Sequence, residues 1–432
     1  MRSAILTALA ALGVGTLAAC SSNSASPLPG TTSPTTPQSI SRTAQSISRA
    51  PEVGHLPRPG HFHAVCGPAA DRFARCHAQL RDDVTSNATS PAGYHPADLQ
   101  SAYNLASASS SGGAGQTVAI VDAYNDPNAA SDVAVYRSTF GLPACSTSTG
   151  CLRIVNQSGG TKLPKSNGGW AQEISLDLDM VSAICPNCHI LLLEASSSSF
   201  TNLGAAVNTA AKLGATEISN SYGGGESSSD TSYDAQYFNH PGVAITVSAG
   251  DSGYGAQYPA ASQYVTAVGG TSLTRNSSVA RGWSESVWSN GATSGTGSGC
   301  SAYDPQPSWQ TATATVANNP GVCSKRVVGD VSSDADPNTG VSVYDSYTYQ
   351  GQGGWLVFGG TSVSSPTLAS VYALAGNAAS VNYGSYSYSH TTSLNDVTTG
   401  SNGSCSGTYL CTAETGYDGP TGNGSPNGTG AF

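Results

Sequence analysis

Charged side chains are scarce in this sequence. Only 10% of its 432 residues are Asp, Glu, Lys or Arg, and the formal net charge is −10. Sixteen Lys and Arg residues are too few and too scattered to form a phosphate-binding face, so we expect no nucleic-acid partner. A chain with few carboxylates builds up little self-repulsion as the pH falls, so its surface tolerates acid.

Long apolar runs are also missing, and the first sixty residues carry the marks of export. In residues 1–20, Arg2 precedes an apolar run that is too short for a membrane span and ends in LAAC at Cys20. This pattern is typical of a bacterial lipoprotein signal peptide, with Cys20 lipidated; an ordinary secretory signal with a chance cysteine is the alternative. Residues 21–60 are rich in Ser, Thr and Pro and are interpreted as a disordered tether. We therefore expect an extracellular protein anchored to the bacterial membrane.

Methionine is nearly absent, which bears on a C-x-x-C-H motif at Cys185, Cys188 and His189. This motif is the attachment signature of a c-type haem, with the histidine as axial ligand. A second axial ligand is needed, and Met1 and Met180 are the only methionines. The apolar run after the motif suits a central strand. We therefore favour a Cys185–Cys188 disulfide over haem.

The other cysteines support this interpretation. Ten cysteines remain when Cys20 is set aside, and they fall into five local pairs. An even number at close spacing in an oxidising compartment favours disulfides. The pairs are Cys66 and Cys76, Cys145 and Cys151, Cys185 and Cys188, Cys300 and Cys323, and Cys405 and Cys411.

Apolar runs that alternate with helical patterns indicate an α/β fold. Residues 200–215 place Leu203, Val207 and Ala210 at helical spacing, which predicts a crossover helix. Strands that are apolar on both faces and joined by helices imply a mostly parallel central sheet flanked by helices. The segment 275–350 is rich in Gly, Ser and Tyr and is expected to form loops. The predicted strands lie at 117–124, 189–195, 216–222, 243–250 and 264–270.

Ser362 is a candidate nucleophile. It follows Gly359 and Gly360 and precedes a helical stretch in which Pro366 suits the first turn. A helix N-terminus favours developing negative charge, so a serine there is well placed for nucleophilic catalysis. On this motif alone, a serine that merely caps the helix is the simpler alternative.

A histidine base for this serine is poorly supported. His189 enters a strand, His240 lies in a turn, and no His-Gly-Thr turn exists. The first five histidines precede the predicted core; they are His55, His61, His63, His77 and His95.

The alternative base comes from residues 168–184, where Glu173 and Asp177 are four residues apart. On a helix they share one face about 6 Å apart along the axis, close enough to cooperate. The stretch also reads as a strand, on which the two acids would lie roughly 13 Å apart. The residue pattern alone leaves both possibilities open.

Six motifs occur together in an order that resembles a known family. They are GGWAQEISLDLDM, SNSYGGGE, VSAGDSGYG, DVSSDADPNTG, GGTSVSSP and LNDVTTG followed by GYDGPTGNGSP. Together they resemble the sedolisins, serine-carboxyl peptidases with a subtilisin-like fold, from about residue 95 to the C-terminus. The resemblance implies that residues 168–184 form a helix and that the chain is a serine-type endopeptidase acting on protein or peptide substrates.

The resemblance also implies roles for individual residues. Ser362 would be the nucleophile, Glu173 the general base and Asp177 its partner, and Asp251 would serve the oxyanion hole. A carboxylate base stays ionised in acid, where histidine is protonated, so we expect hydrolysis best at roughly pH 3 to 5, set by acids near their ordinary pKa values. Asp251 can donate to an oxyanion only while protonated.

Three further residues take expected roles by the same likeness. Asp122, after the first predicted core strand, would extend the acid network. Ser221 and Gly223 would lie where an extended substrate strand pairs with the backbone.

The C-terminal motif resembles the family's calcium site. Oxygen-only ligation by carboxylates and backbone carbonyls suits Ca²⁺. Glu414 stands where the family usually has glycine, so it would bind by its carbonyl or add its carboxylate. The implied ligands are the side chains of Asp396 and Asp418 and the carbonyls of Val397, Glu414 and Gly416.

The expected organisation has a short N-terminal or pro-segment at 61–115 and a peptidase domain at 116–432, acting as a monomer. The family usually carries a long folded pro-domain, so the short segment is a departure. A catalytically inactive peptidase-like binding protein on the cell surface is the alternative. The joint presence of Glu173, Asp177, Asp251 and Ser362 argues against it.

Overall fold

The computed structural model describes residues 60–84, 91–291 and 293–432. The predicted signal peptide, the lipidation site Cys20 and nearly all of the tether lie outside the described residues. Within the described part of the chain, no helix is both long and apolar enough to cross a membrane.

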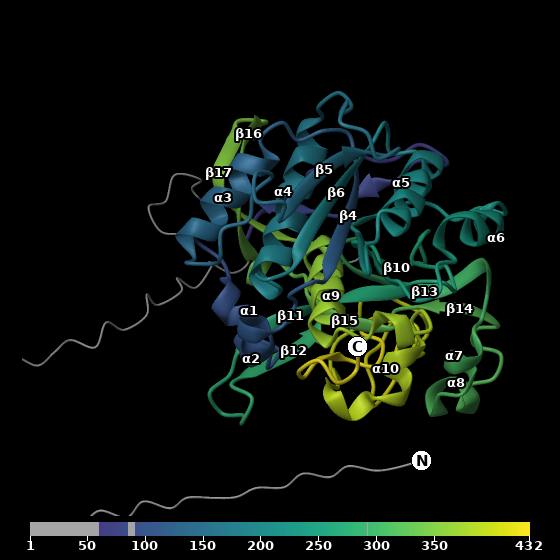
Figure 1. Ribbon diagram of the computed structural model, residues 1–432. Coiled ribbons are helices and arrows are strands. Elements are labelled where there is room, and N and C mark those ends of the chain that lie inside the picture. Colours follow the sequence, from purple (N-terminus) through teal and green to yellow (C-terminus); the bar gives the residue numbers. More distant parts are fainter. Residues whose placement is uncertain (1–59, 85–90, 292) are drawn as a thin grey trace, which may run out of the picture. The chain divides into compact units, whose positions relative to one another are not determined.

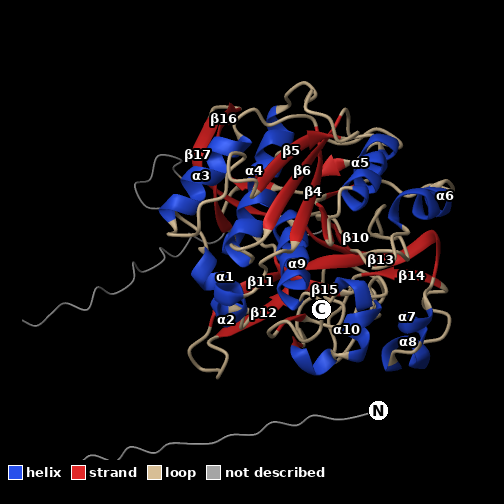
Figure 2. Cartoon of the chain, viewed as in Figure 1, coloured by secondary structure: helices blue, strands red, loops and turns tan. Residues whose placement is uncertain are grey.

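A central sheet of eight strands forms the framework, with strand order β12-β11-β9-β7-β4-β6-β5 and β15 beside β11. Its neighbouring strands are parallel except for the pair β11 and β12. Figure 2 shows these strands in red among blue helices. All five predicted core strands are found here. The bounds are β4 Thr117–Ala123, β5 Leu152–Asn156, β6 His189–Ala195, β7 Glu217–Asn220, β9 Ala244–Ser248, β11 Thr266–Arg275, β12 Trp283–Val287 and β15 Val331–Asp334.

The helices include α4, which carries Glu173 and Asp177, and α9, which carries Ser362; both are visible beside the sheet in Figure 1. The helix bounds are α1 Pro96–Ala102, α2 Ala106–Ser111, α3 Ala129–Thr139, α4 Gly168–Ile184, α5 Phe200–Lys212, α6 Asp230–Tyr233, α7 Ser308–Thr311, α8 Ala314–Asn318, α9 Thr361–Ala375 and α10 Ser385–Ser389.

The alternation of side chains along β4 explains why helices cover both faces of the sheet. Val118 and Ile120 join the apolar cluster that includes α4 and α9 side chains. Ala119 and Val121 join the cluster that includes α5. Successive side chains of a strand point to opposite faces, so α5 lies across the sheet from α4 and α9. The crossover helix predicted at 200–215 is confirmed as α5.

The described residues also form four smaller sheets. An antiparallel sheet has the order β1-β3-β17-β16, a second sheet has the order β10-β13-β14, and two pairs join β2 with β8 and β18 with β19. Their bounds are β1 Phe62–Ala64, β2 Arg75–Cys76, β3 Gln79–Arg81, β8 Tyr222–Gly223, β10 Ser252–Tyr254, β13 Gly295–Pro305, β14 Lys325–Val328, β16 Val341–Tyr349, β17 Gln352–Gly359, β18 Leu394–Asn395 and β19 Ser425–Pro426.

The prediction that residues 275–350 form mainly loops is wrong. Strands β12 to β16 all lie in this stretch. Small residues here permit close backbone contact: a Cβ atom at Gly297 would lie 2.0 Å from the carbonyl oxygen of Ala249. Glycine is therefore used for packing between strands and not only for turns.

All five predicted disulfides are present. Cys66 pairs with Cys76, Cys145 with Cys151, Cys185 with Cys188, Cys300 with Cys323, and Cys405 with Cys411.

Candidate active site

The structure brings together the five side chains that the sequence proposed for catalysis and its acid network. Each is at most 3% exposed. They come from the carboxyl ends of β4 and β9, from α4 and from the start of α9, which agrees with the usual place of ligand sites in α/β sheets. The five are Asp122, Glu173, Asp177, Asp251 and Ser362.

Helix α4 carries the acid pair and resolves the choice between helix and strand. Asn167 caps the helix, its side chain accepting a hydrogen bond from the Trp170 amide at 3.2 Å. Glu173 and Asp177 are therefore one helical turn apart. Asp177 Oδ1 accepts a hydrogen bond from Ser221 Oγ at 2.8 Å.

Burial makes this acid group electrically unusual. It raises the pKa of Asp122 to about 8. Burial, then the neighbouring Asp122 charge, raises the pKa of both Glu173 and Asp177 well above the usual range. The expectation that these acids titrate near their ordinary values is therefore wrong for the cleft as it stands, because the sequence could not show how completely they are buried.

Several oxygens of this group lack donors among the described residues. Both oxygens of Asp122 and Oδ2 of Asp177 have no hydrogen-bond partner there. Glu173 Oε1 also receives no bond of normal geometry, although the nearby Ser362 hydroxyl acts to lower the pKa of Glu173. Buried oxygens without donors are costly unless the acids share protons, and a set of acids that shares protons can also transfer one.

Ser362 is the second residue of α9, and a glycine makes its position possible. Gly360, the N-cap, has φ +96°, and a Cβ atom there would lie 1.9 Å from the His77 carbonyl oxygen. Ser362 Oγ donates to the Ser221 carbonyl at 3.4 Å. The helix begins at Thr361, so Pro366 lies inside it and not in its first turn as predicted.

Asp251 faces the same helix start. Its Oδ1 accepts hydrogen bonds from the amide and the hydroxyl of Thr361, both at 2.8 Å. Its Oδ2 accepts from Gln79 Nε2 at 2.9 Å. Burial raises the pKa of Asp251 to about 6, against the effect of these bonds and of Arg75. Asp251 is therefore protonated in acid and ionised at neutral pH.

The site also contains residues that sequence reasoning missed. Residues 73–79, called the cleft segment below, lie along the expected substrate edge, where β2 pairs antiparallel with β8. The amide of Ala78 donates to Glu173 Oε2 at 2.9 Å. His77, set aside because it precedes the core, is fully buried with its ring against Ser248 and Gln257. Two-residue strands carry no periodicity, so the sequence offered no signal for this arrangement.

Two of the expected calcium ligands approach one loop near the C-terminus. Asp396 Oδ2 accepts from the Gly416 amide at 2.9 Å, and Asp418 Oδ2 accepts from the Glu414 amide at 3.2 Å. Burial and the nearby Asp396 charge help raise the pKa of Asp418 to about 8. Val397, the remaining member of the set, directly follows Asp396 and is buried. The donor set is all oxygen, which fits a hard cation such as Ca²⁺.

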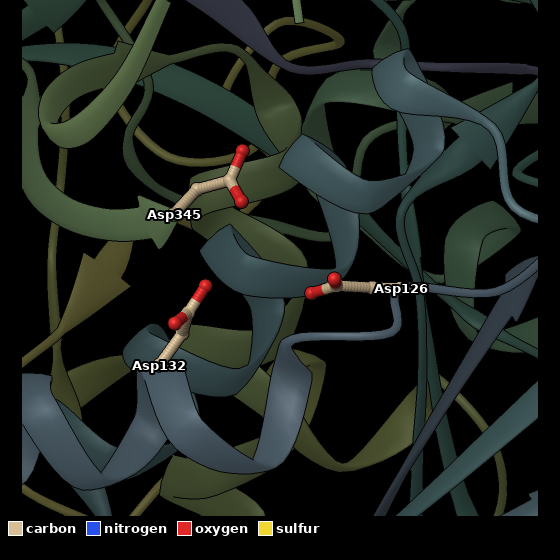
Figure 3. Close-up of side chains that lie close together, drawn as sticks. All are labelled: Asp126, Asp132 and Asp345. Atoms are coloured by element: carbon tan, nitrogen blue, oxygen red, sulfur yellow. The ribbon is translucent and has the colours of Figure 1, made fainter. Parts of the chain in front are cut away.

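A second buried acid cluster is formed by residues of α3, β16 and the loop after β4. One carboxylate oxygen each of Asp126, Asp132 and Asp345 lies within 4.8 Å of the others, and the three side chains point toward one another (Figure 3). Burial raises the pKa of Asp126 to about 7 and that of Asp345 to about 8. No sequence motif had singled out this group.

The chain is similar in sequence to known peptidases. It is 31% identical over 401 residues to kumamolisin of Bacillus sp. (strain MN-32), covering 85% of this chain and 69% of the relative. It is 28% identical over 390 residues to sedolisin of Pseudomonas sp. (strain 101), covering 81% of this chain and 63% of the relative. No family model matches the chain.

A solved structure agrees with these relatives. Pseudomonas sedolisin, a serine-carboxyl proteinase complexed with two molecules of pseudo-iodotyrostatin, superimposes with a TM-score of 0.64 at 26% identity, covering 78% of this chain and 96% of the other. The fold and these matches define a serine-type peptidase with a subtilisin-like α/β architecture. The chain belongs to the sedolisin family.

Proposed function

We propose that this chain is an acid-active serine-carboxyl endopeptidase that works through an acyl-enzyme on protein or peptide substrates. One observation carries the proposal: the His77–Ala78 peptide bond lies among the buried acids of the candidate active site. The Ala78 amide faces Glu173, and the His77 carbonyl faces Gly360. Amide and carbonyl thus meet the two kinds of group that hydrolysis needs, a proton acceptor and a helix N-terminus.

The proposed roles follow from the contacts. Ser362 Oγ attacks the substrate carbonyl, and Glu173 takes its proton and passes it to the leaving amine. Asp177, one helical turn away, holds Glu173 in place and shares its proton. Asp251 in its protonated form donates to the oxyanion, beside the helix N-terminus. Ser221 and Gly223 pair with the extended substrate backbone.

Acid activity follows from two titrations with opposite effects. Glu173 must be ionised to accept a proton, and this sets the acidic limb of the pH profile. Asp251 must be protonated to donate, and its pKa of about 6 sets the limb at higher pH. An optimum of roughly pH 3 to 5 requires the raised pKa of Glu173 to fall when substrate replaces the buried segment and solvent enters, and we propose that it does.

A peptide-library digest across pH 3 to 7, with wild type and Ser362→Ala in parallel, tests this function. Cleavage by wild type alone, strongest in acid, is the expected result. A profile that peaks near pH 8 and survives Glu173→Gln would indicate a histidine base and overturn the mechanism. No cleavage at any pH by correctly processed protein would favour an inactive binding protein instead.

We further propose that Asp396 and Asp418, with the carbonyls of Val397, Glu414 and Gly416, hold Ca²⁺. When bound, the ion neutralises two neighbouring carboxylates and ties the last loops to the core, which is a structural role. It takes no part in hydrolysis.

We also propose that the exported chain is a monomer anchored to the membrane by a lipid on Cys20. The LAAC sequence at that residue supports the anchor. In a bacterial host, Cys20→Ala should move the protein from the membrane fraction to the medium. An unchanged distribution would reject the anchor.

A further inference from the structure

The cleft segment is bound as an extended peptide on both sides of one bond, His77–Ala78. Before the bond, Arg75 pairs with Gly223, and the His77 amide donates to the Ser221 carbonyl at 3.2 Å. After it, Gln79 pairs antiparallel with Gly359 of β17. Backbone pairing on two strand edges is how proteases and other peptide-binding proteins hold a substrate strand.

The His77–Ala78 peptide bond, between these two stretches of backbone pairing, lies beside the residues that we propose to react. Glu173 accepts from the Ala78 amide, and the His77 carbonyl oxygen lies against Gly360, two residues before Ser362. The Ser221 carbonyl that accepts from His77 also accepts from Ser362 Oγ. The amide is thus on the side of the base and the carbonyl on the side of the nucleophile, as a substrate requires.

The His77 side chain fills a closed polar pocket. Its Nδ1 lies 2.7 Å from Ser248 Oγ, and its Nε2 lies 3.1 Å from Gln257 Oε1. A Cβ atom at Gly223 would lie 2.8 Å from the ring, and one at Gly250 would lie 2.8 Å from Gln257 Nε2. The two glycines therefore leave room for an imidazole and for the amide that meets it.

The polarity of the pocket matches a neutral imidazole. Burial and the Arg75 charge lower the pKa of His77 to about 3, so the ring carries one proton. Gln257 Oε1 can only accept, which places that proton on Nε2 and leaves Nδ1 to accept from the Ser248 hydroxyl. An apolar side chain would leave both partners buried without a hydrogen bond. A lysine would put an unpaired charge there.

We propose that this pocket selects histidine on the carboxyl-donating side of the cleaved bond, and that the first such bond is the chain's own His77–Ala78. The inference rests on the proposed peptidase function. Ser362 Oγ bonds to the His77 carbonyl carbon while its proton goes to Glu173. The C–N bond breaks, and Ala78 leaves as an amine with that proton. Water then adds its oxygen to the acyl carbon, frees Ser362, and leaves His77 as a carboxyl group.

The segment is held in place by contacts that remain after the bond is cut. The Cys66–Cys76 disulfide closes a loop directly before His77, and β1 pairs with β3, which follows the bond. The Val65 amide also donates to the Ala78 carbonyl at 3.2 Å. The chain before the bond therefore lies beside the chain after it, and cutting does not by itself release the fragment.

The first experiment follows the full chain by intact mass and N-terminal sequencing during incubation in acid. Wild type should give a chain that begins at Ala78 and a fragment that ends at His77, and Ser362→Ala should stay whole. His77→Leu should slow this cut about tenfold or more, because two hydrogen-bond partners lose their match. His77→Gln, which keeps a donor and an acceptor, should recover part of the rate. His61→Ala, an exposed change in the stretch before the cleft segment, is the matched control.

The second experiment gives the processed enzyme a series of peptides, Arg-Ser-X-Ala-Gln, in which X is His, Gln, Leu or Lys. The value of kcat/KM should be highest for His and at least about tenfold lower for Leu. Ser248→Ala and Gln257→Leu should each reduce the ratio of His to Leu. Equal cleavage of all four peptides would overturn the pocket while leaving the peptidase function intact. A wild-type chain that stays whole while cutting the His peptide would overturn the internal substrate, and failure to cut any peptide would overturn the function itself.

Discussion

Two groups of buried acids in this molecule share one electrostatic feature and differ in their surroundings. In the cleft, Glu173 and Asp177 have strongly raised pKa values, and in the second cluster Asp345 does too. The largest cause is the same in both groups, namely loss of water around a buried carboxylate. A raised pKa therefore does not by itself distinguish a catalytic acid from a structural one.

The donors around each group make the distinction. In the second cluster each acid accepts a hydrogen bond from the backbone amide of a residue within two positions of a cluster member. The donors are Asn128 for Asp126, Ser346 for Asp132 and Tyr347 for Asp345. In the cleft, the backbone amide that Glu173 accepts belongs to Ala78, in the segment we propose to be replaceable by substrate. An oxygen without a partner does not distinguish the groups, since Asp345 Oδ2 also lacks one among the described residues; the difference is that the donor to Glu173 lies in a segment that substrate would replace.

The largest expected effect contrasts one amide substitution in each group. Glu173→Gln should lower turnover about 10²–10⁴-fold, because an amide cannot take the serine proton. Asp345→Asn is the matched control and should leave turnover unchanged, because its carboxyl contacts neither nucleophile nor substrate. Steady-state kinetics with a His-containing peptide measure both. An equal loss of turnover in both variants would mean that hydrogen-bond donors do not distinguish a catalytic acid from a structural one.

The next effect concerns Asp251, which combines features of both groups. Its hydrogen-bond donors are fixed, as in the second cluster, but its proton is proposed to take part in catalysis. Asp251→Ala should lower turnover about 10²–10³-fold, the usual cost of an oxyanion donor. Asp251→Asn should lose less. Because the folded pKa is about 6, wild-type activity should decline as the pH rises through that value, and the Asn variant should decline less. The ratio of variant to wild-type kcat against pH is the measurement, and a flat ratio would reject the role.

A smaller effect is expected from calcium. If Asp396 and Asp418 bind the ion, excess chelator should lower the melting temperature, since an ion present at a hundred times its Kd stabilises by about 2.7 kcal/mol. Asp418→Ala should abolish this sensitivity, whereas Asp345→Asn should keep it. Calorimetry with and without chelator gives the answer. Loss of sensitivity in the Asp345 variant instead would place the ion in the second cluster.

The smallest effect is the pH dependence of stability at Asp345. Its folded pKa of about 8 lies above the unfolded value, so the folded state binds the extra proton. The stability this proton gives is complete below about pH 4 and is lost as the pH rises toward 8. Asparagine does not titrate, so Asp345→Asn should lose less stability over that range than wild type does. Urea unfolding at the two extremes would detect the difference, and parallel curves for the two proteins would refute it.

The sequence predicted what depends on local pattern. Strand β6 is a continuous apolar run, helix α5 has apolar residues at helical spacing, and Cys185 with Cys188 can hardly pair elsewhere. The cleft segment could not be predicted, because its contacts join distant positions: Ala78 and Glu173 are 95 residues apart, and Gln79 and Asp251 are 172 apart. Burial of Glu173 and Asp177 could not be predicted for the same reason, and so their titration was misjudged.

The covalent bond between His77 and Ala78 has a consequence for how activity depends on protein concentration. While the bond is whole, the segment competes with any other peptide at an effective concentration in the millimolar range, and dilution does not change this. Once it is cut, the same residues are a separate ligand, and their occupancy follows mass action. Freshly processed enzyme should therefore gain activity per molecule on dilution, whereas the uncut chain should not.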